Sequence, residues 1–159
     1  MFLRRKEYNY IISEIINRQD ISKTKLFLKY KPKDFDGIDY ENRKHASNRV
    51  PHCYATSPIL VAMRTTNLKM VELLCQNVKI DKRLKNGMFH LHYAAKNENL
   101  EIFQLVYSLA KNKRPLKISE KGDKITPFDI MSEKFRGEVF TKINISPEKS
   151  SRISRKRKR

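Results

Sequence analysis

The sequence predicts an all-α fold made of stacked pairs of short helices, and three observations support this fold class. The same unit occurs twice at constant spacing within residues 57–106. In each unit apolar residues recur every three positions, which is typical of a helix with one buried face. Small alanines stand where neighbouring helices would have to pack closely. The 159 residues suffice for one domain with a modest core.

The repeated unit covers residues 57–74 and 89–106. Ile59 and Leu91 are 32 positions apart, and Ala62 and Ala94 have the same separation. Because the register holds through the whole unit, the two segments are predicted to be structural repeats. Apolar stripes of the second helix in each unit are formed by Leu68, Val71 and Leu74, and by Leu100, Phe103 and Val106.

Weaker copies flank these two units. A third copy begins at residues 126–131, where Phe128 lies 37 positions after Leu91, so the extra residues are placed in the connection at residues 111–115. Pro58 and Pro127 fit the first turn of a helix, and the preceding Ser or Thr is predicted to cap it. Residues 2–17 and 21–30 are predicted to form two helices around a polar turn at residues 18–20.

Residues 89–95 carry the motif that identifies the family. Their sequence, Phe-His-Leu-His-Tyr-Ala-Ala, resembles the ankyrin signature Thr-Pro-Leu-His-x-Ala-Ala and matches it at four of six specified positions. Asn86-Gly87 resembles the tip of the ankyrin hairpin. The departures are His90 in place of Pro, Leu60 in place of His, and Thr66 and Glu98 where Gly usually separates the helices. The resemblance implies an ankyrin-repeat solenoid of helix-turn-helix units with hairpin fingers. The departures weaken the helix termini and predict modest stability, not a different fold.

This resemblance implies a divergent ankyrin domain over residues 1–145. It comprises a capping repeat at 1–35, a loop at 31–55 and repeats at 56–87, 88–123 and 124–143, followed by a disordered basic tail at 146–159. The loop is rich in Pro, Asp and Asn, and a loop of that length is either functional or disordered. A partly ordered finger is the favoured interpretation.

The charge of the chain is strongly positive. Lys and Arg total 35 against 17 acids, which gives a net charge of +18. Residues 149–159 hold seven of these bases, so the other 148 residues still carry 28 bases against the 17 acids. Such a charge favours an acidic protein, nucleic acid or an anionic membrane surface as partner. Biased nucleotide composition, with Lys filling solvated faces, is an equally open explanation.

The number of cysteines and the hydropathy of the sequence predict where in the cell the protein is found. Cys53 and Cys75 are too few for a disulfide scaffold, and both are expected to be reduced thiols in an intracellular protein. The apolar stretch at residues 10–16 is interrupted by Ser13 and Glu14, so no secretory signal is expected there. No apolar run reaches the length of about 18 residues that a membrane helix requires, so no segment is expected to span a membrane, and no membrane is included among the expected partners.

Motifs for catalysis are missing from the sequence. There is no Gly-rich phosphate loop, no Gly-x-Ser-x-Gly, no His-Glu-x-x-His and no Cys-x-x-Cys. His90 and His92 form a His-x-His pair that suggests a metal, but no Cys or acid stands at ligand spacing. The resemblance instead implies that His92 bonds the backbone near the hairpin. The sequence therefore predicts no enzyme, no cofactor and no metal site.

Binding residues are predicted from the repeat register. In a solenoid, hairpin tips and the concave helix face contact partners. Tyr93 is expected on the concave face, where an exposed Tyr flanked by cations suits a binding hot spot. The alternative is that Tyr93 packs on a neighbouring finger and the lysines only solubilise. The predicted partner-binding residues are Lys82, Arg83, Lys85, Met88, Tyr93, Lys96, Asn97, Lys121, Asp123 and Lys124.

The basic tail suggests a second role. Its run Arg155, Lys156, Arg157, Lys158 and Arg159 resembles a nuclear localisation signal that binds importin. The leading hypothesis is a non-catalytic protein-binding regulator that shuttles between nucleus and cytoplasm and masks a partner protein. The alternative is electrostatic binding of nucleic acid by body and tail, which predicts salt-sensitive affinity. A ubiquitin-ligase adaptor is a third possibility, although no F-box-like segment is visible.

Overall fold

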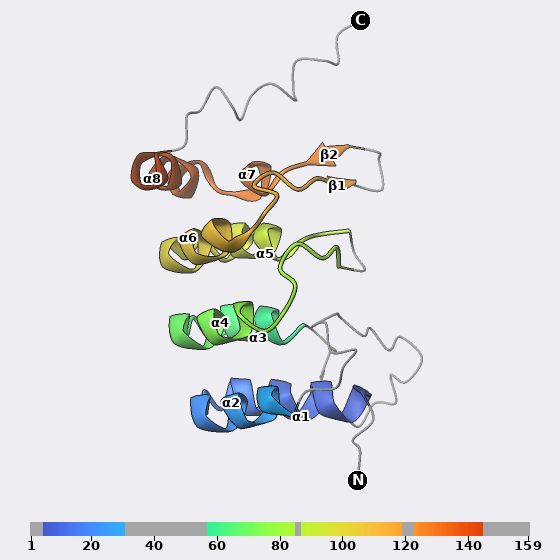
Figure 1. The fold of residues 1–159 in the computed structure, drawn as a ribbon. Coiled ribbons are helices and arrows are strands. Elements are labelled where there is room, and N and C mark those ends of the chain that lie inside the picture. The colour runs from blue at the N-terminus through green and yellow to red at the C-terminus, as the bar shows by residue number, and fades with distance from the viewer. Residues whose placement is uncertain (1–4, 31–56, 85–86, 119–122, 145–159) are drawn as a thin grey trace, which may run out of the picture.

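The computed structural model describes residues 5–30, 57–84, 87–118 and 123–144. In these residues eight helices form four antiparallel pairs that lie one on another (Figure 1). The predicted loop at residues 31–55 and the tail at residues 146–159 lie outside the described residues. The pairs are α1 (Arg5–Asn17) with α2 (Ile21–Lys29), α3 (Pro58–Arg64) with α4 (Leu68–Cys75), α5 (His90–Asn97) with α6 (Leu100–Leu109), and α7 (Pro127–Ile130) with α8 (Glu133–Ile143).

The stacking follows the order of the repeats. The first helices of the pairs contact one another in the sequence α1, α3, α5, α7, and the second helices do so in the sequence α2, α4, α6, α8. A short antiparallel hairpin joins α6 to α7, with β1 (Lys117–Ile118) paired to β2 (Lys124–Ile125). The described parts of the connections from α4 to α5 and from α6 to α7 project to one side of the stack (Figure 1). The predicted all-α solenoid of helix-turn-helix units with hairpin fingers is thereby confirmed.

Side-chain caps begin the second helix of every pair. Asp20, Asn67, Asn99 and Ser132 each accept a hydrogen bond from the backbone N–H three residues on, at 2.9–3.3 Å. Such a cap satisfies an N–H that the first turn leaves unpaired. The prediction that Ser57 caps α3 is wrong, because its hydroxyl makes no cap bond and lies beside the ring of His90 instead.

The turns within the pairs use left-handed residues other than glycine. Gln19, Thr66 and Glu98 have φ of 56°, 52° and 53°. Two of them, Thr66 and Glu98, occupy the positions where the sequence lacks the usual Gly. Because a β carbon clashes in this region, each of these turns costs about 1 kcal/mol relative to glycine.

The core is continuous along the stack. Ala62, Ala94 and Ala95 have no exposed surface, so their small side chains let α3 and α5 approach closely, as predicted. At the C-terminal end the core is aromatic: the ring of Phe103 lies 6.2 Å from Phe128 and 6.1 Å from Phe135, edge to face in both cases. No helix in the described part of the chain is both long and apolar enough to cross a membrane.

Candidate protein-binding surface

Two buried histidines join neighbouring repeats. His92 is completely buried; its Nδ1 accepts from the backbone N–H of Phe89 at 3.2 Å, and its Nε2 lies 3.1 Å from the carbonyl oxygen of Ile125 in β2. Since a carbonyl only accepts, Nε2 carries the hydrogen and donates it. His92 therefore fastens α5 to the next hairpin, which is the structural role that the resemblance implied.

His90 joins α5 to the preceding repeat by hydrogen bonds. Its Nδ1 donates to the carbonyl oxygen of Ile80 at 2.9 Å, and its Nε2 lies 3.2 Å from the hydroxyl of Ser57 at the start of α3. Burial lowers the pKa of His90 below its ordinary value, and the bond to Ile80 and the charge of Asp81 oppose this only in part. The neutral ring, with one donor and one acceptor, matches both partners.

The connection between α4 and α5, described at residues 76–84 and 87–89, contains part of the predicted binding set. The backbone N–H of Leu84 donates to the carbonyl oxygen of Met88 at 2.7 Å. Gly87 has a positive φ of 77°, a conformation that glycine adopts without steric cost. Arg83 is exposed, whereas Lys82 and Met88 are half-buried. Lys85 lies outside the described residues.

The β1–β2 hairpin and the inner helix place most of the others. Lys124, in β2, and Lys96, near the end of α5, are exposed, and Asp123 is half-buried. Tyr93 is half-buried and packs against the core. The side-chain amide of Asn97 donates to the carbonyl oxygen of Met63 at 2.7 Å, so this group holds two repeats together. Lys121 and the tail residues 155–159 lie outside the described residues.

Sequence reasoning missed the contact between the two connections. The carboxylate of Asp81 accepts from the backbone N–H groups of Lys111 and Asn112 at 3.0 and 3.2 Å, although these residues lie 30 and 31 positions later. This contact joins the connection that carries Lys82 and Arg83, the two residues after Asp81, to the connection that begins at Lys111. The only signal in the sequence was an Asp at the end of one repeat. Its partners are backbone N–H groups, which almost every residue carries, so the sequence does not reveal them.

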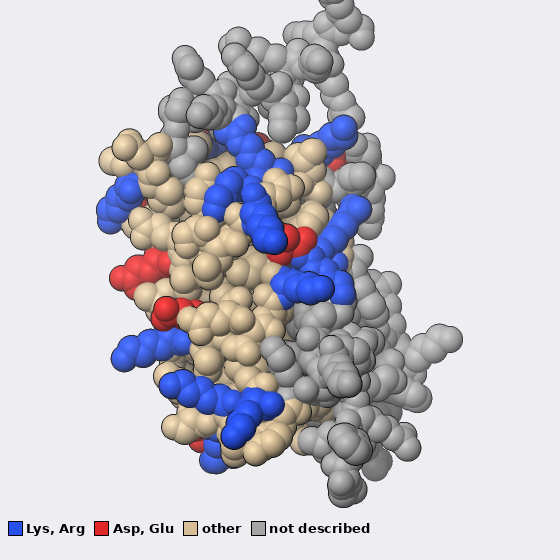
Figure 2. All heavy atoms as spheres, in the orientation of Figure 1, with Lys and Arg blue, Asp and Glu red and all other residues tan. Residues whose placement is uncertain are grey.

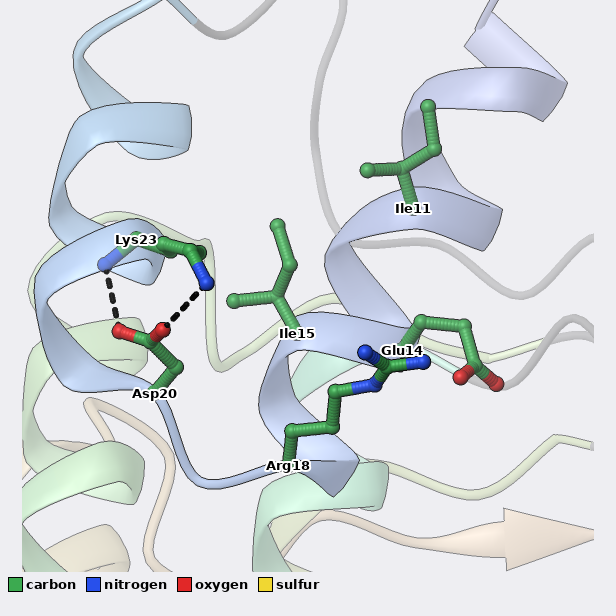
Figure 3. A pocket seen from close by; sticks show the side chains of 6 residues that line it. All are labelled: Ile11, Glu14, Ile15, Arg18, Asp20 and Lys23. Carbon is green, nitrogen blue, oxygen red and sulfur yellow. Dashed lines mark hydrogen bonds and ion pairs between the residues drawn. The ribbon is translucent and has the colours of Figure 1, made fainter.

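A shallow hollow of about 170 Å³ lies at the N-terminal end of the stack, between α1 and α2 (Figure 3). Ile11 and Ile15 give it an apolar wall. Asp20 accepts from the backbone N–H of Lys23 at 2.9 Å and lies 3.0 Å from its ammonium (Figure 3). The backbone bond first, and then the ammonium, hold the pKa of Asp20 below its ordinary value. These polar groups serve to cap α2.

The described residues offer neither a metal cluster nor a reactive thiol. Within the described ranges no three His, Cys, Asp or Glu side chains gather as metal ligands would. Cys75 is buried, and desolvation followed by the charge of Glu72 raises the pKa of its thiol to about 12. A thiol of this kind is unreactive at neutral pH. Cys53 lies outside the described residues.

These features define a class: a solenoid of helix pairs in which connecting segments and buried imidazoles join the second pair to the third and the third pair to the fourth. A family model for ankyrin repeats in three copies matches residues 16–115, and the chain belongs to the ankyrin-repeat family. The pair α7 and α8 extends the array beyond the matched residues. A comparison with curated proteins found no match. Ankyrin repeats generally mediate protein–protein interaction, and the family is a non-catalytic interaction module.

Proposed function

We propose that this chain is a protein-binding regulator that covers the surface of a partner protein and acts without catalysis. The observation that carries the proposal is the arrangement of exposed cations on a rigid frame. Arg83, Lys96 and Lys124 come from two connections and an inner helix of adjacent repeats. His90 and His92 hold these elements together. A surface held in its binding conformation loses little entropy when a partner docks.

The sign of the charge supports an acidic partner. Lys and Arg exceed Asp and Glu by 18 over the whole chain. Figure 2 shows Lys and Arg side chains spread over one face of the described residues, with acidic atoms in smaller patches. A positive face steers an acidic protein toward it and repels basic competitors.

Nuclear import through the tail is the second part of the proposal. Residues 155–159 form an unbroken run of five bases, and an extended cationic segment suits an acidic importin groove. The protein would then shuttle between cytoplasm and nucleus and meet its partner in either compartment.

One experiment tests both parts. The intact chain and a variant with Arg155–Arg159 changed to Ala are expressed in cells, imaged, and used to recover partners after nuclease treatment. We expect one discrete protein partner with both forms and nuclear accumulation of the intact form only. Unchanged localisation in the variant would refute the import role.

Electrostatic nucleic-acid binding is the alternative function, and the net charge of +18 favours it. It predicts that recovered material disappears after nuclease treatment. It also predicts an affinity for duplex DNA that falls steeply, by orders of magnitude, as salt rises to physiological concentration. A protein partner retained under both conditions would reject this alternative.

A further inference from the structure

We propose that a basic cluster at the junction of two repeats, made of Lys82, Arg83, Lys111 and Arg114, binds an Asp- and Glu-rich segment of the partner protein. The inference rests on the proposed function and specifies its partner and site. Neither Lys111 nor Arg114 was singled out by the sequence, because they lie 28 to 32 positions away from the first two residues.

The cluster exists because Asp81 ties two connections together. Its two oxygens accept from the backbone N–H groups of Lys111 and Asn112, at 3.0 and 3.2 Å. The carboxylate is therefore engaged with the backbone on both oxygens. Residues 79–84 and 110–116 contain six Lys or Arg and one acid, Asp81. Figure 2 shows Lys and Arg side chains gathered beside a small acidic patch on the side where the connections lie in Figure 1.

The second connection is held in shape by its own side chains. Asn112 accepts from the backbone N–H of Arg114 at 3.1 Å. The ammonium of Lys113 folds back on α6, where it donates to the carbonyl oxygens of Tyr107 and Ser108 and lies 4.9 Å from the Tyr107 ring centre. Lys113 thus closes the helix end, while the exposed Lys111 side chain extends into solvent.

Charge and position favour carboxylates as the ligand. Arg83 and Lys111 are exposed and accessible to a ligand, whereas Lys82 and Arg114 are half-buried at the edge of the cluster. Arginine forms paired hydrogen bonds with a carboxylate, and lysine adds a point charge. Because the frame is ordered before binding, an acidic segment gains these contacts without having to order the loops.

The surroundings favour a protein segment over nucleic acid. The aromatic ring beside the cluster, Tyr107, is stacked on Phe103 at 5.7 Å, meets Phe128 edge to face, and is covered by Lys113. Single-stranded nucleic acid binds largely by stacking bases on open aromatic faces, and this ring presents none. Glu72 in α4 and Glu101 in α6 are exposed. They would repel a long polyanion that extended from the cluster across the surface of these two helices.

The test is a titration of the full chain with a short fluorescein-labelled peptide of alternating Glu and Ser residues, followed by fluorescence anisotropy. Arg155–Arg159 are changed to Ala in every sample so that the tail does not bind the peptide. The variant R83E/K111E reverses one exposed cation in each connection. Its control, K25E/K69E, makes the same change in net charge on exposed lysines of α2 and α4.

We expect R83E/K111E to lose about tenfold in affinity and the control to lose less than about twofold. Equal losses in both variants would overturn the proposal, because they would show only the effect of net charge. Tighter binding of oligothymidine or duplex DNA than of the peptide, lost in R83E/K111E, would also overturn it in favour of nucleic acid.

A second variant separates the arrangement of the cluster from its charge. D81A makes the protein more positive but removes the link between the two connections, so we expect about threefold weaker peptide binding. Tighter binding by D81A would contradict the organised cluster. In cell extracts, a partner that R83E/K111E still recovers would refute this site and leave the proposed function standing. Failure of the intact chain to recover any protein would refute the proposed function. The peptide titration would still show whether the cluster binds an acidic segment.

Discussion

The junction between α3 and α5 and the junction between α5 and α7 solve one problem in two ways. At the second, His92 stands at the signature position and reaches forward to Ile125. At the first, Leu60 occupies that position, and His90 reaches back to Ile80 and Ser57 from the place where the signature has Pro. An imidazole that donates at one nitrogen and accepts at the other is kept at both junctions. Both junctions therefore have imidazole hydrogen bonds between layers, but the imidazole stands at a different position of the repeat in each.

The two junctions also differ in what surrounds the histidine. Beside the second lies the aromatic group of Phe103, Phe128 and Phe135. The first is lined by aliphatic residues and alanines such as Ile59, Met70 and Ala94, all completely buried. Rings bury more area per residue than alanine does. The second junction should therefore depend more on packing and the first more on its polar contacts.

The largest expected effect comes from removing the central ring of the second junction. Phe103 is completely buried, so Phe103→Ala should cost about 3–5 kcal/mol of unfolding free energy through lost transfer energy and the cavity left behind. Urea denaturation followed by circular dichroism measures this. A loss below about 1 kcal/mol would mean that the aromatic group is not what holds α7 and α8 to the array.

Removing the imidazoles should come next. His90→Ala removes the partner of the Ile80 carbonyl and of the Ser57 hydroxyl, at a cost of about 2–3 kcal/mol. His92→Ala removes the partner of the Phe89 N–H and of the Ile125 carbonyl, at a similar cost. The informative comparison is with His90→Gln, whose amide also donates and accepts and should recover part of the loss. If glutamine were no better than alanine at position 90, the polar contacts with Ile80 and Ser57 would not be the source of stability.

Acid should weaken the first junction selectively. Burial holds the pKa of His90 below its ordinary 6.5, so the unfolded state binds the proton more readily than the folded state does. The contribution is complete above pH 6.5 and is lost as pH falls below it, by up to about 1.4 kcal/mol per pH unit. Denaturation between pH 7.5 and 5 should therefore show a shallower slope for His90→Gln than for the unaltered chain. Parallel slopes would contradict this account.

The smallest predicted effect is a gain in stability. Thr66 has a φ of 52° and its hydroxyl bonds only to the adjacent Thr65 carbonyl, so Thr66→Gly should stabilise by roughly 0.5–1 kcal/mol. Thr65→Gly is the matched control, because Thr65 has a right-handed φ of −77° and should lose stability instead. Thermal unfolding of the two variants should move in opposite directions, and a shared direction would refute the strain argument.

The helix pairs themselves were predictable from local patterns. The spacing of 32 positions and the apolar stripes are local signals, and α3 to α6 lie where these signals place them. The first two helices, α1 and α2, also lie at the predicted segments. Periodicity and capping depend on neighbours within a few residues, so the sequence alone determined the family, the fold class and the order of the elements.

Only the tertiary structure decided how the repeats are joined and which side chains remain for a partner. The bonds of His90 to Ile80 and Ser57, of Asn97 to Met63 and of Asp81 to residues 111–112 span 10 to 34 positions. Their acceptors and donors are mostly backbone groups, which every residue carries, so residue identity does not reveal them. They form because stacking brings one layer against the next. The same stacking occupies the amide of Asn97 and places the backbone of Lys111 against the carboxylate of Asp81.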